Sequence, residues 1–137
     1  TLEDKSPLSK ERMKAPDNKD VGTREESEGS GIIHIDNKSD FESKVLKASG
    51  SYLVDLFSDS CPPCRMLAPT ISSLADKYSG KVAVCKVNLD RAPAIAREYG
   101  VMAIPTVLII KDGKEVTRLV GLQPESVYVK QLDMLID

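Results

Sequence analysis

Two cysteines three residues apart, Cys61 and Cys64, carry the clearest chemical signal in this sequence. At a helix start, residues i and i+3 lie on one face, within the Cα separation that a disulfide tolerates. The pair could therefore open and close a disulfide with little backbone movement. Unpaired N–H groups and the helix dipole lower the pKa of a thiol in the first turn. We expect Cys61 to be the attacking thiolate and Cys64, one turn deeper, to resolve a mixed disulfide.

Pro62 and Pro63 fill the gap between the cysteines. Both fit the first helical turn, where a missing N–H costs nothing and the fixed φ favours the helix. They also withhold two N–H donors from the thiolate of Cys61. We therefore expect a rigid ring in which hydrogen bonding to Cys61 is weakened. Small changes of this kind matter, because roughly 1.4 kcal/mol shifts the reduction potential of a dithiol by about 30 mV.

Zinc binding, haem attachment and a structural crosslink are the competing interpretations of the pair. Zinc would need two more ligands from Cys85 and His34, and there is no second C-x-x-C and no H-x-x-x-H. Haem attachment needs a histidine where Arg65 stands. A crosslink across two residues closes too small a loop to add much stability. The sequence favours a redox pair and predicts no metal site. Cys85 is expected to be a small buried hydrophobe and His34 a surface residue.

Asp55 is the second unusual residue, because it lies within the apolar stretch "LVDLF". A carboxylate is expensive to bury unless it is protonated or partnered. Apolar residues on both sides argue against a simple surface position. We expect an acid of raised pKa that exchanges protons with Cys64 through water. Lys86, in the neighbouring strand pattern, could pair with Asp55, although an alternating strand also places lysines toward solvent.

Hydrophobic periodicity predicts the elements that hold these residues. From Gly31 onward the order βαβαβαββα indicates a mixed sheet with helices on both faces. The expected elements are strand 32–35, helix 37–48 capped by Ser39 or Asp40, strand 51–58, helix 62–78, strand 81–90, helix 92–100, a hairpin over 106–120 turned at Asp112-Gly113, and a helix after Pro124. The predicted core stripe of helix 62–78 is Met66, Leu67, Ile71, Leu74 and Ala75. Pro105 by position alone indicates a strand start, and periodicity does not decide whether its peptide bond is cis.

The chain has 137 residues, a net charge of −2 and three cysteines. So weak a charge argues against nucleic-acid binding, and no apolar run reaches the roughly 18 residues of a membrane span. Residues 1–30 are polar and contain no aromatic residue. We therefore expect a flexible N-terminal extension over 1–30 and a folded domain over 31–137. Because the chain starts with Thr1, we also expect a preceding segment to have been removed.

Four stretches, in their order and spacing, resemble the thioredoxin family: "VDLFSDSCPPCRMLAP", "VNLD", "AIPTVLIIKDGK" and "VGLQPE". The opening "IIHIDNKSDFESKVLKASGSYLVDLF" is similar to that family's first helix and second strand. The resemblance covers residues 31–137. It implies an α/β thioredoxin fold, with a central mixed sheet of four or five strands flanked by about four helices. It also implies dithiol–disulfide exchange with protein substrates and no cofactor besides the redox-active disulfide.

The resemblance further implies roles for single residues. Cys61 matches the nucleophile and Cys64 the resolving cysteine, while Asp55 matches the buried acid and Lys86 the lysine near it. These four residues are the expected catalytic set.

A second set is expected to bind substrate: Pro62, Pro63, Ile104, Pro105 and Gly121. By resemblance, Pro105 matches the cis-proline beside the active site, and the backbone of Ile104 pairs with a substrate strand. Gly121 matches the glycine that lines the substrate groove.

Departures from the family pattern bear on partners and location. The usual Gly-Pro gap is Pro62-Pro63 here, and Ser60 and Phe57 stand where the family carries tryptophan. Pro62 and the polar N-terminal segment together resemble thioredoxin-like proteins exported to the periplasm, where the segment would be a spacer from a removed signal or a membrane anchor. A cytoplasmic enzyme with a disordered extension is the alternative.

The sequence thus predicts a monomeric thiol–disulfide oxidoreductase that reduces protein disulfides. An upstream redox partner, either a reductase or a membrane electron carrier, would supply it. Two alternatives stay open: a periplasmic oxidant of protein thiols, and a thioredoxin-fold binding module whose C-x-x-C is incidental. The presence of Asp55 argues against the binding module, because a pure binder has no need of a proton relay.

Overall fold

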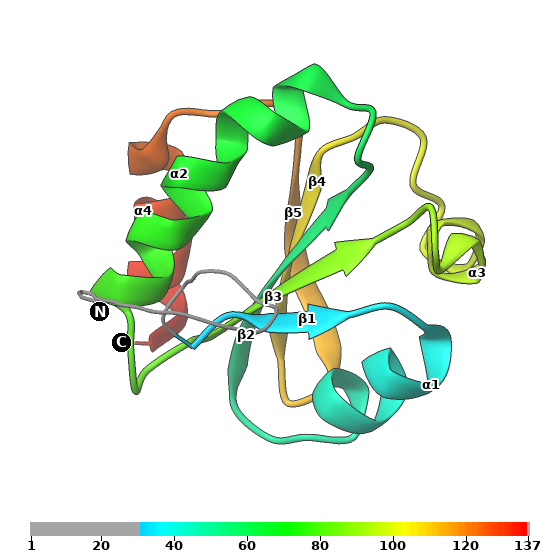
Figure 1. Ribbon diagram of the computed structural model, residues 1–137. Helices are drawn as coiled ribbons and strands as arrows, with labels where there is room; N and C mark the ends of the chain where they lie inside the picture. The colour runs from blue at the N-terminus through cyan, green and yellow to red at the C-terminus, as the bar shows by residue number, and fades with distance from the viewer. Residues whose placement is uncertain (1–30, 137) are drawn as a thin grey trace, which may run out of the picture. The chain divides into compact units, whose positions relative to one another are not determined.

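A five-stranded mixed sheet is the centre of the computed structural model, which describes residues 31–136 (Figure 1). Its strands are β1 (Ile33–Ile35), β2 (Ser51–Phe57), β3 (Ala83–Asn88), β4 (Thr106–Lys111) and β5 (Lys114–Val120). They lie in the order β1-β3-β2-β4-β5. β1 and β2 run parallel to β3, whereas β4 runs antiparallel to both β2 and β5. The predicted mixed sheet is confirmed, and β2 is its central strand.

Helices cover both faces of this sheet. They are α1 (Lys38–Phe41), which continues into the π-helical turn η1 (Glu42–Leu46), α2 (Pro62–Lys77), α3 (Pro93–Glu98) and α4 (Glu125–Ile136). In Figure 1, α2 and α4 lie on one side of the sheet, and α1 and α3 lie on the other. Every predicted element is present, with ends that differ from the prediction by up to two residues. The predicted extension over 1–30 lies outside the described residues.

The central strand β2 is buried on both faces, as its apolar pattern predicts. Val54 and Leu56 belong to a cluster with Phe41 and Ile95, on the side that α1 and α3 cover. Side chains alternate along a strand, so Asp55 points to the opposite face, toward α2 and α4. This alternation places a carboxyl group inside an otherwise apolar layer.

Two predictions about the helices are wrong. The cap of α1 is Asn37 and neither Ser39 nor Asp40, because the extended backbone of Asn37 lets its side chain accept the N–H of Asp40 at 2.8 Å. Met66 was expected in the core but is 66% exposed. Leu67, one residue later and about 100° around the helix, lies on the buried stripe instead.

The predicted hairpin turn at Asp112-Gly113 is confirmed. Both residues have positive φ, +50° and +83°, which is the type I′ geometry that suits the twist of the paired strands. Asp112 also connects the turn to the start of β2. Its carboxylate accepts the N–H of Gly50 at 2.8 Å, and its own N–H donates to the carbonyl of Gly50 at 2.9 Å.

Gly113 is a position where alanine is expected to be costly. Its φ is positive, and an added Cβ would collide with the backbone carbonyl oxygen of Leu46 at the end of η1. Left-handed strain and overpacking together predict that Gly113→Ala lowers the free energy of unfolding by about 3 kcal/mol. Gly100→Ala is the matched control, since Gly100 has a φ of +60° and open space around its Cβ, so strain alone costs about 1 kcal/mol. Urea denaturation measures both, and equal losses would contradict the steric explanation.

Candidate active site

A disulfide joins Cys61 and Cys64 across the first turn of α2, with their Cα atoms 5.2 Å apart. Cys61 is the N-cap residue, with an extended backbone (φ −107°, ψ 104°), and Pro62 and Pro63 occupy the first two helical positions. The predicted placement of the pair at a helix start is therefore confirmed. Both sulfur-bearing residues are buried, with Cys61 at 7% exposure and Cys64 at 4%.

The first turn of α2 presents a backbone N–H to Cys61. The N–H of Cys64 donates to Sγ of Cys61 at 3.2 Å. Pro62 and Pro63 have no N–H to offer, so the turn's remaining donor is aimed at the first cysteine. In the reduced protein this N–H and the helix dipole favour the thiolate at Cys61.

Adding an N–H to this turn should raise the reduction potential of the pair. Pro63→Ala restores a donor at the second helical position, whose N–H an N-cap side chain commonly accepts. A further hydrogen bond stabilises the thiolate, and therefore the reduced form, by an amount that corresponds to about 10–30 mV. Pro62→Ala, at the first helical position, should shift the potential less. Equilibration with glutathione buffers measures both variants, and a lower potential in Pro63→Ala would refute this explanation.

The loop before β4 brings a second segment against the reactive sulfur. Sγ of Cys61 lies 3.8 Å from the carbonyl oxygen of Ile104, although the two residues are 43 positions apart in the chain. The Ile104-Pro105 peptide bond is cis, as the family resemblance implies. The carbonyl of Pro105 accepts the N–H of Gly121 at 2.8 Å. Gly121 has open space where a Cβ would lie. The structure thus gathers Ile104, Pro105 and Gly121 beside the disulfide.

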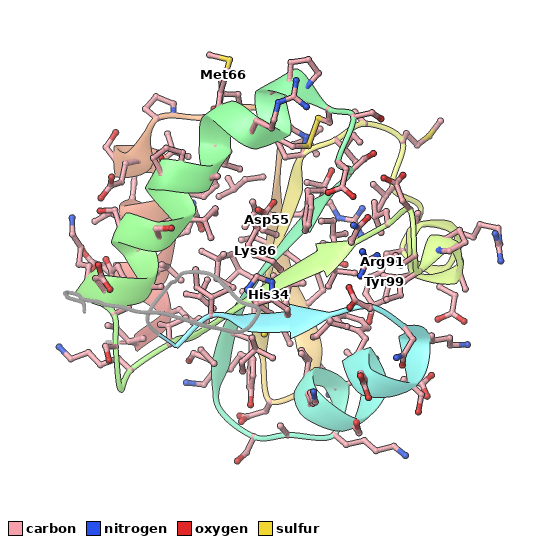
Figure 2. The ribbon with its side chains drawn as sticks, viewed as in Figure 1. His34, Asp55, Met66, Lys86, Arg91 and Tyr99 are labelled. Carbon is pink, nitrogen blue, oxygen red and sulfur yellow. A yellow bond between two sulfur atoms is a disulfide. The ribbon has the colours of Figure 1, made fainter. Side chains whose placement is uncertain are left out.

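Asp55 is nearly inaccessible, with 1% of its surface exposed. Burial raises the pKa of its carboxyl group to about 7, and the positive charge of Lys86 opposes this rise. Lys86 lies opposite Asp55 in the β2–β3 register, and its Nζ sits 4.8 Å from the ring centroid of Phe57. Figure 2 shows Asp55 and Lys86 together on the side of the sheet that α2 covers. The raised pKa expected of Asp55 is therefore found, and Lys86 acts on this carboxyl through its charge.

A polar anchor that the sequence analysis missed holds the loop before Cys61. The Asp90 carboxylate accepts the hydroxyl of Ser58 at 2.8 Å and the N–H of Asp59 at 3.1 Å. Asn88 donates to the carboxylate of Asp59 at 3.1 Å. The position of these residues could have predicted the contact. They follow the carboxyl ends of β2 and β3, and the ends of adjacent parallel strands meet at one edge of the sheet.

The described residues 31–136 also bear on metal binding and membrane insertion. They contain no group of three or more His, Cys, Asp or Glu side chains placed to hold a metal ion. Among them, no helix is both long and apolar enough to cross a membrane. Cys85 is fully buried and His34 is exposed, as predicted.

Comparison with known proteins gives a consistent result. The family model described as Thioredoxin matches residues 32–134. A protein named Thioredoxin from Chlorobaculum thiosulfatiphilum is 44% identical over 93 residues, covering 68% of this chain and 86% of that protein. Thioredoxin 1 from Synechococcus elongatus is 43% identical over 93 residues, with 68% and 87% covered. Thioredoxin 2 from Chlorobaculum tepidum is 43% identical over 104 residues, with 76% and 95% covered.

The range that the family model matches includes the disulfide, the strand that carries the buried acid and the loop with the cis peptide bond. The family resemblance expected from the sequence is therefore confirmed, and so is its fold. The chain belongs to the thioredoxin family and is a thiol–disulfide oxidoreductase that uses its own disulfide as the redox group.

Proposed function

We propose that the protein reduces disulfides in other proteins, with Cys61 attacking and Cys64 resolving. The Cys61 thiolate attacks one substrate sulfur, which forms a mixed disulfide and releases the other substrate sulfur as a thiolate. Cys64 then attacks Sγ of Cys61, closes the internal disulfide and releases the second substrate thiol. Two electrons pass to the substrate. The observation that carries this assignment is the Cys64 N–H directed at Sγ of Cys61.

Asp55 serves the second step in this proposal. Cys64 must lose its proton before it attacks, and a nearby carboxylate with a pKa of about 7 can take that proton near neutral pH. We assign the transfer to a water, since Asp55 is buried on β2 and its Oδ1 makes no hydrogen bond within the described residues. Lys86 supports the charged form of Asp55 through its positive charge.

Substrate binding is assigned to the surface around the reactive sulfur. An extended substrate segment would lie along the backbone of Ile104 and Pro105 and over the open space beside Gly121. Pro62 and Pro63 border the same sulfur at the start of α2. Ser60, directly before Cys61, stands where the family carries a tryptophan.

Two apolar side chains stand out near these segments. Met102, in the loop before Ile104, is 96% exposed, and Met66, one turn into α2, is 66% exposed. Met66 projects away from the sheet in Figure 2. Flexible methionines suit a surface that binds several partners, so they support recognition of varied protein substrates.

A disulfide reductant needs an electron donor, and the family implies a reductase in that role. A membrane electron carrier, a monomeric state and a periplasmic location stay predictions of the sequence. The periplasmic prediction depends on Pro62 and on residues 1–30, which lie outside the described part of the chain. The relatives are named for their family and not for a compartment, so a cytoplasmic location fits the comparisons equally well.

Trapping the mixed disulfide tests the two cysteine roles. Cys64→Ser is expected to accumulate a covalent complex with a disulfide-bearing protein substrate, because Cys61 attacks and nothing resolves the product. Cys61→Ser should accumulate none. Non-reducing electrophoresis and mass spectrometry distinguish the variants, and a complex trapped by Cys61→Ser alone would reverse the roles. Equilibration of the wild type with glutathione tests direction, since a potential above that of the glutathione pool would favour the oxidant.

A further inference from the structure

Tyr128, on α4, places a polar atom inside the apolar layer between α4, α2 and the sheet. Its side chain is fully buried. Its hydroxyl makes no well-aligned hydrogen bond to any residue that the structure describes, although the backbone of Gln123 acts on it as a weak donor. Buried tyrosine hydroxyls normally have a partner, because an unpaired one loses its bonds to water without replacement.

A second buried polar atom also lacks a hydrogen-bond partner. Within residues 31–136, the buried side-chain oxygens and nitrogens without a hydrogen-bond partner are the Tyr128 hydroxyl and Oδ1 of Asp55. Both belong to the layer under α2 and α4, because Asp55 points away from the cluster of Val54 and Leu56 on the opposite face. Two orphaned polar atoms therefore share one side of the sheet.

The two groups also interact electrostatically. Burial is the largest cause of the raised pKa of Tyr128, hydrogen bonding from the backbone of Gln123 lowers it, and the charge of Asp55 raises it further. The charge on Asp55 thus acts on the phenol, and no direct hydrogen bond joins the two groups.

We propose that Tyr128 is a positioning residue for Asp55, and that its hydroxyl and Oδ1 of Asp55 hold one buried water between them. A water that makes two to four hydrogen bonds satisfies both atoms at once. An ionised carboxylate only accepts, so the bound water donates to Asp55 while it accepts the Tyr128 proton. Tyr128 thereby stabilises the charged form of Asp55. It also fixes the water through which, in the proposed function, Asp55 exchanges a proton with Cys64.

Other groups around Asp55 must be separated from this effect. Lys86 faces it from β3, and Cys64 lies at the start of α2. His34, on β1, lies opposite Lys86 in the same row across the sheet. β4 presents the apolar Val107 opposite Asp55. None of these groups changes when the Tyr128 hydroxyl alone is removed.

The test is Tyr128→Phe, which removes the hydroxyl and keeps the ring that fills the core. Without the hydroxyl the water loses its hydrogen bond to Tyr128, and its weaker bond to the charged form should raise the pKa of Asp55 by about half to one unit. The pH titration of the infrared carbonyl band of protonated Asp55 measures this shift, and Asp55→Asn identifies the band. Tyr78→Phe is the matched control, because the Tyr78 hydroxyl already donates to Asp133 at 2.6 Å. An unchanged or lowered pKa of Asp55 in Tyr128→Phe overturns the proposal, and so does an equal rise in Tyr78→Phe.

The catalytic part of this inference rests on the proposed proton relay through Asp55. The pH dependence of mixed-disulfide resolution tests the two separately. The pH midpoint for resolution of a mixed disulfide should rise in Tyr128→Phe by the same amount as the pKa of Asp55. In an Asp55→Asn background the substitution of Tyr128 should have no effect on that midpoint. If Asp55→Asn itself leaves resolution unchanged, the relay fails, and the infrared titration still decides whether Tyr128 positions Asp55.

Discussion

Replacing Cys61 with serine is expected to reduce the rate of insulin-disulfide reduction to that of dithiothreitol alone. A serine hydroxyl is not ionised near neutral pH and cannot form a disulfide, so neither the mixed disulfide nor the internal disulfide can form. The N-cap position would still be filled well by serine, and the helix start would remain. The loss should therefore be chemical and not a failure to fold, which circular dichroism of the variant can verify.

The third cysteine supplies the control for this experiment. Cys85 lies fully buried in β3, and burial raises the pKa of its thiol to about 12, with Lys44 opposing the rise. It is therefore a neutral thiol with no access to substrate. Cys85→Ala should keep the wild-type rate of insulin reduction. Activity above background in Cys61→Ser, or its loss in Cys85→Ala, would contradict the assignment of the redox pair.

Replacing Asp55 with asparagine is expected to stabilise the protein by about 4 kcal/mol at pH 8 and to leave it unchanged near pH 4. The pKa of Asp55 is about 7 in the folded protein, against an ordinary value of 3.8. Between these values the folded state holds a proton that the unfolded state has lost, so stability falls as the pH rises from about 4 to 7. Roughly three units at 1.4 kcal/mol each give the penalty that asparagine removes.

Denaturant unfolding at pH 4 and pH 8 measures this difference. Asp36→Asn is a suitable control, because Asp36 and its partner Arg91 are both more than half exposed. An exposed ion pair contributes less than about 1 kcal/mol, so the control should change little at either pH. The same stabilisation at both pH values in Asp55→Asn would show that the effect does not come from ionisation. A more stable Asp55→Asn that resolves mixed disulfides slowly would indicate that the wild type sacrifices stability for the relay.

Features encoded by neighbouring residues were predictable from the sequence. The helix start at Cys61 follows from two prolines in the first turn, and the hairpin follows from Asp112-Gly113. The burial of Asp55 followed from the apolar residues on either side of it. The cis bond before Pro105 was predictable only through the family resemblance, since its local sequence favours the trans form.

The predictions of buried residues failed where two adjacent positions are both apolar. Met66 and Leu67 are both apolar, and the prediction placed both on the buried stripe. Packing against the sheet and α4 selects Leu67 and leaves Met66 exposed. The Asp90 anchor was missed for a similar reason, because its contacts to Ser58 depend on the ends of two strands meeting. Periodicity reports which face of an element is buried, but it does not report what lies opposite.

The sequence by itself determined the redox pair, the order of the elements and the presence of a carboxyl group in the core. Each of these depends on residues that are close together in the chain. Only the tertiary structure decided that the carbonyl of Ile104 lies 3.8 Å from Sγ of Cys61 and that Tyr128 is buried on the face of the sheet that carries Asp55. Hydrogen bonds and electrostatic interactions depend on separation in space. That separation is set by how α4 and the loops pack on the sheet, which the local pattern of residues does not encode.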